Sequence, residues 1–310
     1  MSILYSVKDD RNNCLLNAIK QALPEQTIVC WPDCPNPEQI EIAIVWGISE
    51  GFFEQFPNLT HLLSLSAGVD YLLNRNDIPD RVSIVRLHDA GMGARMAEYV
   101  LMGTLWAQRK MPELAIAQKK AQWMPSLSPA LTAEFHVGLL GAGVLASKVA
   151  ITLADVGYPV STWSRQPKQI PGVTSYFGQS QRADFLANLD VLACLLPLTP
   201  STAGILNATL FDELPKGAFL INAGRGAHLL EDDLIPALDS GQLSGALLDV
   251  FIHEPLTTDH PFWSHPRITI TPHVAAETQA AESAAQIGRS LECIARGEDP
   301  PGLVDRTRGY

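Results

Sequence analysis

The chain has 310 residues, of which 46% are hydrophobic and 18% charged, so it holds enough apolar material for one large core or two medium ones. It carries 22 Lys and Arg against 33 Asp and Glu, and the net charge of −11 argues against nucleic acid as a partner. The N-terminus has no basic stretch ahead of a long apolar core, and no run reaches about 18 apolar residues. We therefore expect a cytoplasmic protein with neither a signal peptide nor a membrane span.

The five cysteines are odd in number and scattered, which argues against a disulfide framework and favours a reducing compartment. Cys30 and Cys34 are the one close pair in the sequence. Because no second pair of Cys or His residues stands at ligand spacing, we expect structural thiols there rather than a zinc site. The sequence predicts no metal site elsewhere.

Short apolar runs alternate with helical stretches from residue 1 to about residue 90. The strands predicted here are 2–7, 27–30, 40–46, 61–66 and 82–87. This alternation is typical of an open parallel sheet. Residues 93–122 then predict two helices broken at Met111 and Pro112, and the first of them, long and apolar, suits a connection between domains.

A second alternating series follows. Its predicted strands are 136–140, 159–163, 190–196, 217–222, 246–250 and 268–271. Six strands with crossover helices predict a doubly wound sheet of the dinucleotide-binding type. A last helix over about 275–296 runs past that sheet, so we expect the tail to return to the first domain. The fold class is therefore α/β, with two Rossmann-like doubly wound parallel-sheet domains.

The string GxGxxA follows the first strand of the second series and opens a helix. A string of this kind is weak by itself, but the strand before it and the helix after it make it specific. Gly141 provides the tight turn, Gly143 lets the backbone approach a pyrophosphate, and Ala146 lets the helix pack on the strand. Free N–H groups at the start of the helix then bind phosphate.

The second strand of this series ends in TWSRQPK, where an NAD enzyme would carry Asp or Glu for the ribose hydroxyls. Ser164, Arg165 and Lys168 stand there instead. A guanidinium suits bidentate contact with a 2′-phosphate, so we predict NADPH as the preferred cofactor, with NADH possible. The alternative is a solvated basic turn without a ligand.

Three polar residues follow three different strands of the second series, where ligands bind in open α/β sheets. Arg225 can hold a carboxylate and polarise the adjacent carbonyl, and His273 can deliver a proton near neutral pH. Glu254 can stabilise the protonated imidazole and orient it. Taken by itself, each residue has a structural alternative: Arg225 could be a surface charge, and Glu254 could be the start of a loop. Other histidines are weaker candidates because we expect them in a solvent-facing loop or before a helix, namely His253, His260, His265 and His88.

The segment SLSAGVDYLL of the first domain contains Ala67, Gly68 and Val69 in a turn between a strand and a helix. Successive N–H groups in such a turn can form an anion-binding nest for a substrate carboxylate. The alternative is a plain strand-to-helix turn. Trp46, at the end of its strand, is predicted to restrict the pocket to acids of two or three carbons, or else it is a core residue.

These residues resemble the D-isomer-specific 2-hydroxyacid dehydrogenase family. The matching motifs are LLGAGVLA, CLLPLTPST, LINAGRGA, LLDVFIHEPL and ITITPHVAAET, in the family's order, with SLSAGVD in the first domain. They cover nearly the whole chain, and GxGxxA in place of GxGxxG is a departure that the fold tolerates. The resemblance implies a discontinuous substrate domain of residues 1–95 completed by 285–310, a dinucleotide-binding domain of residues 96–284, and a homodimer built on the cofactor domains.

Within that family, IVWGI, DAGMGARMAEYVL, TWSRQPK and LVDRTRGY resemble the enzymes that reduce glyoxylate and hydroxypyruvate. The resemblance implies an enzyme that uses NADPH to reduce glyoxylate to glycolate and hydroxypyruvate to D-glycerate, with Arg225, Glu254 and His273 as its catalytic set. It also implies that Trp123 approaches the partner subunit's site. Two alternatives stay open: a dehydrogenase of another 2-hydroxy acid, and a nucleotide-sensing scaffold without turnover.

The cofactor-binding prediction covers residues at or after the ends of all six predicted strands of the second series. Its members are Gly141, Ala142, Gly143, Val144, Leu145, Trp163, Ser164, Arg165, Lys168, Leu195, Leu196, Pro197, Thr202, Ala223, Gly224, Asp249 and Ala275. Residues 195–197 enter this set through the resemblance, which implies that they flank the cofactor.

Overall fold

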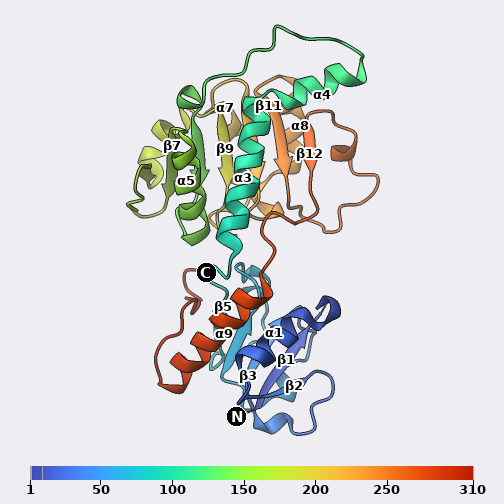
Figure 1. Ribbon diagram of the computed structural model, residues 1–310, viewed down its shortest axis with the longest axis vertical. Coiled ribbons are helices and arrows are strands. Elements are labelled where there is room, and N and C mark those ends of the chain that lie inside the picture. Colours follow the sequence, from blue (N-terminus) through green and yellow to red (C-terminus); the bar gives the residue numbers. More distant parts are fainter. Residues whose placement is uncertain (1, 9, 310) are drawn as a thin grey trace. The chain divides into compact units, whose positions relative to one another are not determined.

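The computed structural model describes residues 2–8 and 10–309, which form two all-parallel sheets with helices around them (Figure 1). The chain divides into two compact units. Unit 1 consists of Met1–Met92 and Thr278–Tyr310, and unit 2 of Gly93–Glu277. The predicted α/β class with two doubly wound parallel sheets is confirmed. The substrate and cofactor roles assigned to the two parts of the chain stay predictions here.

Within the described residues, the sheet of unit 1 has five strands in the order β2-β1-β3-β4-β5. Their bounds are β1 (Ser2–Val7), β2 (Thr27–Cys30), β3 (Ile40–Trp46), β4 (His61–Ser64) and β5 (Ser83–Arg86). Ile42, Ala43, Ile44 and Val45 of β3 are at most 1% exposed. A strand covered on both faces has a nearly continuous apolar sequence, and this pattern is why residues 40–46 were predicted as a strand.

Two helices of unit 1, α1 (Cys14–Ala22) and α9 (Ala280–Ala295), lie side by side against the sheet (Figure 1). The short helix α2 (Asp70–Leu73) follows β4. α9 buries Ala284, Ile287 and Leu291 in the core of unit 1, so residues distant in the sequence complete that core.

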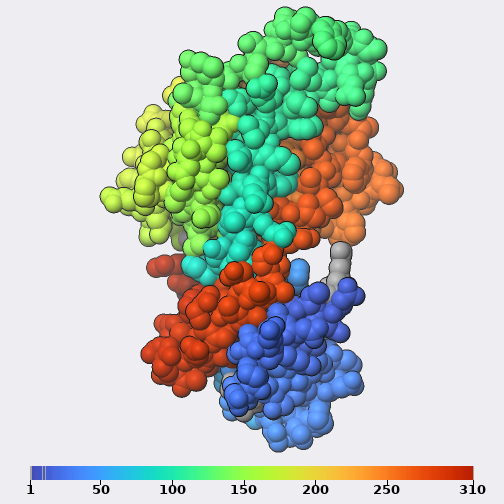
Figure 2. Space-filling model, viewed as in Figure 1, coloured from blue at the N-terminus to red at the C-terminus, as the bar shows by residue number. Residues whose placement is uncertain are grey.

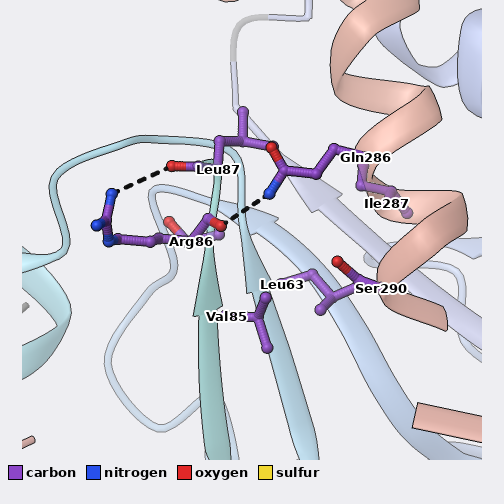
Figure 3. Close-up of a pocket in the computed structure, with 8 residues that line it drawn as sticks. Leu63, Val85, Arg86, Leu87, Gln286, Ile287 and Ser290 are labelled. Atoms are coloured by element: carbon purple, nitrogen blue, oxygen red, sulfur yellow. Dashed lines mark hydrogen bonds between the residues drawn. The ribbon is translucent and has the colours of Figure 1, made fainter. Parts of the chain in front are cut away.

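α9 also carries a buried amide that binds the main chain at the end of β5. The side chain of Gln286 donates to the carbonyl of Arg86 at 3.1 Å (Figure 3). It also accepts the N–H of His88 at 2.9 Å. A small cavity, about the size of one water molecule and lined by both apolar and polar residues, lies beside this contact. The tail runs antiparallel to β5, where Gly302 accepts the Arg86 N–H and Val304 donates to Ile84, both at 2.9 Å. The residues after α9 therefore pack on unit 1.

Within the described residues, the sheet of unit 2 has seven strands in the order β12-β11-β10-β9-β6-β7-β8. Their bounds are β6 (Val137–Leu140), β7 (Val160–Ser164), β8 (Thr174–Phe177), β9 (Val191–Cys194), β10 (Ala218–Asn222), β11 (Leu243–Leu248) and β12 (Ile268–Ile270). From β6 the chain runs outward to β8, then returns to place β9 on the other side of β6. This reversal is the switch point at which doubly wound sheets bind nucleotides.

Helices cover both faces of the sheet of unit 2. They are α3 (Met92–Gln108), α4 (Met111–Lys119), α5 (Val144–Val156), α6 (Arg182–Leu186), α7 (Ala208–Asp212) and α8 (Glu231–Asp239). One core cluster joins α3 and α5 to one face, and a second joins α6, α7 and α8 to the other. Single turns of 3-10 helix are η1 (Arg11–Asn13), η2 (Pro37–Gln39), η3 (Phe53–Gln55), η4 (Thr132–Glu134), η5 (Gln179–Gln181), η6 (Gly226–His228) and η7 (Pro261–Trp263).

Two details differ from the prediction for unit 2. Six strands were expected and β8 was missed, because it is an edge strand that pairs only with β7 and has no fully buried residue. The helix break was expected at Met111 and Pro112, and it lies just before them at Lys110, whose φ is 57°. Among the helices of the described residues, none has both the length and the apolar character needed to cross a membrane.

Candidate active site

The turn between β6 and α5 has the geometry that a pyrophosphate requires. Gly141 has a φ of 117°, and a Cβ built there would lie 3.1 Å from the carbonyl oxygen of Leu195. Gly143 is the N-cap residue just before the 13-residue helix α5, and a Cβ built on it would meet no atom within 4 Å. Ala146 is 2% exposed, so the helix packs closely on the strand. The open backbone at Gly143 and the N–H groups of the first turn fit a dinucleotide phosphate.

The end of β7 presents two cationic side chains and no carboxylate in residues 163–168. The indole Nε1 of Trp163 donates to the carbonyl of Gly178 at 2.8 Å, which fixes the ring at the strand end. Arg165 and Lys168 are exposed in the turn that follows. This turn can therefore accept a phosphate on the adenosine ribose but offers no acid for the ribose hydroxyls.

The loops after β9 and β10 lie next to each other because the two strands pair. Leu195 donates its N–H to the carbonyl of Leu140 at 2.9 Å, so the loop starts beside the glycine turn. The hydroxyl of Thr202 donates to the carbonyl of Pro197 at 2.7 Å and closes this loop. Ala223 and Gly224 of the predicted set follow β10 directly. The predicted cofactor residues thus gather at the carboxyl edge of the sheet of unit 2.

A histidine and a glutamate form a hydrogen-bonded pair at this edge. The Nδ1 atom of His273 lies 2.8 Å from Oε2 of Glu254, and Oε1 of Glu254 accepts the N–H of Phe251 at 2.9 Å. Both carboxylate oxygens are thus held, which fixes the direction of the ring. The side chains of His273 and Glu254 are 50% and 37% exposed, so the pair remains open on one side.

The pair shifts the pKa of each partner toward the charged form. The hydrogen bond to Glu254 raises the pKa of His273; burial opposes this rise, as does the charge of Arg225, while the charges of Glu254 and Asp249 support it. Burial alone would raise the pKa of Glu254, but the bonds from His273 and Phe251 and the charges of His273 and Arg225 outweigh it, so the pKa is lowered. His273 is therefore suited to hold a proton near neutral pH.

A buried carboxylate shapes the loop that carries His273. Asp249 is 1% exposed and accepts the N–H groups of Val274 and Ala275, both at 2.9 Å, and the hydroxyl of Thr271 at 2.6 Å. The His273 N–H donates to the carbonyl of Asp249 at 2.8 Å, and the His273 backbone is left-handed with a φ of 56°. The contact predicted between Asp249 and a cofactor stays a prediction.

Tyr99 of α3 extends this network, because its hydroxyl lies 2.7 Å from that of Thr271. Burial raises the pKa of Tyr99 well above its usual value, so the phenol stays protonated. The sequence reasoning missed Tyr99 and Thr271 as supports of the His273 loop. Their contact spans 172 residues, and neither residue type carries a signal for such a role.

Arg225 lies in the loop after β10 and reaches the same region. Its guanidinium donates to the carbonyl of Gly224 at 2.8 Å, and its charge acts on the pKa of both Glu254 and His273. A Cβ on Gly226 would overlap the backbone carbonyl of Phe251, so only glycine lets the two loops meet here. The structure thus brings together the three residues predicted after β10, β11 and β12.

The predicted substrate residues of unit 1 lie at the ends of β3 and β4. Trp46 is 48% exposed, so the alternative of a core residue is wrong. The hydroxyl of Ser66 donates to the carbonyl of Gly68 at 2.7 Å, and Arg86 donates to that of Ala67 at 3.3 Å. Val69 closes the turn and is buried. The turn has a defined geometry, and its binding of a carboxylate stays a prediction.

Two histidines expected in solvent are largely covered. The side chain of His260 is 19% exposed and accepts the N–H of Phe262, and that of His265 is 11% exposed and accepts the N–H of Arg267. These rings satisfy loop N–H groups, which explains their burial. His253 is exposed, as expected.

A doubly wound parallel sheet, a glycine turn at its switch point and an Arg, Glu and His set at the same edge define a dinucleotide-dependent oxidoreductase. Residues 101–275 match the family model described as "D-isomer specific 2-hydroxyacid dehydrogenase, NAD binding domain". The chain belongs to the D-isomer-specific 2-hydroxyacid dehydrogenase family and is an NAD(P)-dependent dehydrogenase, which confirms the resemblance.

The chain is similar over nearly its whole length to proteins named as reductases and to solved structures. It is 43% identical over 300 residues to glyoxylate/hydroxypyruvate reductase A of Yersinia enterocolitica and 44% identical over 301 residues to that of Serratia proteamaculans, with 95% of each chain covered. A solved D-isomer specific 2-hydroxyacid dehydrogenase from Xanthobacter autotrophicus, in complex with NADPH and MES, has a TM-score of 0.95 at 37% identity. An NADPH-dependent glyoxylate/hydroxypyruvate reductase from Sinorhizobium meliloti, in complex with NADP and sulfate, has a TM-score of 0.91 at 34% identity. Each of these two alignments covers 100% of this chain and 99% of the solved chain.

Proposed function

We propose that this protein uses NADPH to reduce small 2-oxo acids, glyoxylate to glycolate and hydroxypyruvate to D-glycerate. The observation that carries the proposal is the hydrogen-bonded pair of His273 and Glu254 beside Arg225 at the nucleotide-binding edge of the sheet. The names of the two reductase relatives and the NADPH and NADP complexes of the similar structures support it.

The cofactor is assigned to the edge of unit 2. The turn at Gly141 and Gly143 would hold the pyrophosphate, and Arg165 with Lys168 would bind the 2′-phosphate. When bound there, NADPH supplies the hydride. The loop of residues 195–197 and the backbone at Ala223 would flank it.

The residues of the chain supply the binding and the proton. Arg225 holds the substrate carboxylate and polarises the neighbouring carbonyl as negative charge develops on its oxygen. Protonated His273 donates its proton to that oxygen, and Glu254 favours the protonated ring before the transfer. We also assign the N–H groups of residues 67–69 to the carboxylate and Trp46 to the limit on chain length.

Oxidation of NADPH, followed at 340 nm with glyoxylate or hydroxypyruvate, tests this function. Replacing His273 by Asn should lower kcat by roughly 10²- to 10⁴-fold, the usual range for a lost general acid. The matched control is His253→Asn, in an exposed loop position, which should leave kcat unchanged. Absence of turnover with both acids refutes the proposal, and turnover with longer 2-oxo acids alone favours a different 2-hydroxyacid dehydrogenase.

We further propose that the enzyme is a homodimer built on unit 2. Exposed apolar residues lie on α3 and α4 and in the segment that follows them, and α3 and this segment lie on the face viewed in Figure 2. They are Met102, Leu105, Leu114, Trp123, Met124 and Leu131. Exposed apolar side chains in this part of the chain favour a protein interface, and a second copy is the partner that the family resemblance implies. Light scattering during gel filtration should give twice the 33.7 kDa mass of the chain.

The proposed cellular location is the cytoplasm. The odd number of scattered cysteines supports a reducing compartment.

A further inference from the structure

A buried histidine that the function does not use lies three residues after Arg225. His228 ends η6 and is 0% exposed. Its Nδ1 accepts the backbone N–H of Arg225 at 3.0 Å, and its Nε2 lies 3.3 Å from the carbonyl oxygen of Pro197. A backbone N–H can only donate and a carbonyl can only accept, so the ring is the tautomer that carries its proton on Nε2. Each ring nitrogen therefore has a separate partner.

These two partners belong to two different functional loops. Pro197 lies in the loop after β9, which is assigned to the cofactor. Arg225 lies in the loop after β10 and is assigned to the substrate carboxylate. One imidazole thus connects the two loops at their backbones.

The surroundings of the ring leave little freedom for the imidazole. A Cβ built on Gly224 would lie 2.8 Å from Nδ1 of His228, so the ring occupies space that only glycine leaves open. The carbonyl of His228 accepts the N–H of Leu206 at 2.8 Å, and the carbonyl of Ala227 accepts that of Gly204 at 2.9 Å. The backbone on both sides of the loop is therefore fixed, and the ring sets the distance between the loops at Pro197 and Arg225.

We propose that His228 is a positioning residue that holds the substrate-anchoring Arg225 and the cofactor loop at Pro197 in register. Its Nδ1 accepts the backbone N–H of Arg225, and its Nε2–H donates to the carbonyl of Pro197. The inference rests on the proposed function, because the roles of the two loops come from it.

Two substitutions separate the two bonds. His228→Asn keeps an acceptor near the position of Nδ1 and loses the donor to Pro197, whereas His228→Gln keeps a donor near the position of Nε2 and loses the acceptor for Arg225. Substrate KM is measured with glyoxylate, and the Kd for NADPH is measured by fluorescence without substrate.

We expect His228→Gln to raise the KM for glyoxylate roughly tenfold with the Kd for NADPH within about twofold, because one buried bond is lost on the Arg225 side. His228→Asn should raise the Kd for NADPH by a similar factor with a smaller effect on the KM. The two variants should therefore differ in which constant rises, the KM for glyoxylate in His228→Gln and the Kd for NADPH in His228→Asn. A purely structural role would not produce this difference.

The control for stability alone is Gln242→Ala. The Gln242 side chain donates to the carbonyls of Phe211 and Leu214 at 2.7 and 2.9 Å, and it lies just before β11, at the opposite edge of the sheet. This variant should lower Tm and leave both KM and Kd unchanged. The inference is wrong if both His228 variants lower Tm but leave KM and Kd unchanged, as Gln242→Ala should. It is also wrong if both variants change KM and Kd by equal factors. Failure of the proposed function is distinct from this, because it appears as a wild-type protein that does not turn over glyoxylate or hydroxypyruvate.

Discussion

At the scale of single residues, the chemistry of the site depends on one carboxylate. Glu254 uses one oxygen to accept a backbone N–H and the other to face the ring of His273, so it cannot rotate away without losing both bonds. The histidine itself occupies a left-handed backbone conformation that non-glycine residues rarely adopt. The bonds that Asp249 accepts from the surrounding loop offset this strain.

Glu254→Gln should change the pH dependence of the reaction as well as its rate. The bond to Glu254 is the main cause that raises the pKa of His273, so its loss lowers that pKa. In the proposed reaction His273 donates the proton, so activity is expected to fall as pH rises through the pKa of this group. We expect the alkaline limb of kcat/KM to move to lower pH, with a larger loss of rate at pH 8 than at pH 6. A pH profile from 5 to 10 measures it.

The control for this variant is Glu213→Gln, which removes a carboxylate that pairs with Arg182 on α6, away from the site. Its profile should match that of the wild-type enzyme. An alkaline limb that stays in place in Glu254→Gln would show that this carboxylate does not set the proton affinity of His273.

Arg165→Ala should weaken the preference for NADPH over NADH. The turn after β7 offers a guanidinium for a 2′-phosphate and no carboxylate for a ribose hydroxyl. Loss of a charge-assisted contact should reduce the ratio of kcat/KM for the two cofactors roughly tenfold. Steady-state kinetics with both cofactors measure the ratio, and Arg109→Ala at the end of α3 serves as the control. An unchanged ratio in Arg165→Ala would contradict the assignment.

At the scale of elements, the site is assembled by loops that follow adjacent parallel strands. The loops after β10 and β11 touch backbone to backbone at Gly226 and Phe251, and this contact holds Arg225 near Glu254. The β12 loop is joined to α3 through Thr271 and Tyr99. The elements therefore control the spacing of the charged groups.

Gly226→Ala should disrupt this spacing. The added methyl would overlap main-chain atoms of Phe251. Because a change of side-chain rotamer cannot relieve a clash with the main chain, one of the two loops must shift. We expect a loss of about 3 kcal/mol in unfolding free energy and a lower kcat. Urea unfolding and turnover measure both. The control is Gly288→Ala in α9, where a Cβ would come no closer than 3.6 Å to Leu23, and equal effects of the two variants would refute the contact argument.

The elements also show what sequence reasoning can reach. The strands β1, β2 and β3 were predicted with their observed bounds because buried parallel strands are continuous apolar runs. β8 was not predicted, because an edge strand with partly exposed faces has no continuous apolar run in its sequence. The site residues that follow the strands were predicted from their chemistry, whereas His228 and Thr271 were not singled out because their contacts join separate segments of the chain.

At the scale of the molecule, the two units differ in how the chain builds them. Both core clusters of unit 2 are drawn from residues within Gly93–Glu277. Unit 1 needs two separate segments, because α9 buries Ile287 and Leu291 and the tail adds Val304 to the core. One unit is therefore continuous and the other is not.

Residues 93–277, expressed alone, should fold and bind NADPH, whereas residues 1–92 alone should not fold. The first fragment keeps a complete core and the glycine turn, and the second lacks α9 and the tail. Circular dichroism and NADPH fluorescence measure the two results. An unfolded 93–277 fragment would contradict the independence of unit 2, and a folded 1–92 fragment would contradict the need for α9.

The split in unit 1 has a consequence for synthesis on the ribosome. Its first segment emerges early, but α9 and the tail that complete it are made only after all of unit 2. At about 5–20 residues per second, the interval between residue 92 and residue 310 lasts roughly 10–40 s. During that time the apolar strands of the first segment lack their covering helix while unit 2 can already reach its native state. The nascent chain therefore has a period in which chaperones can bind it, and this period lasts until residues 278–310 have been made.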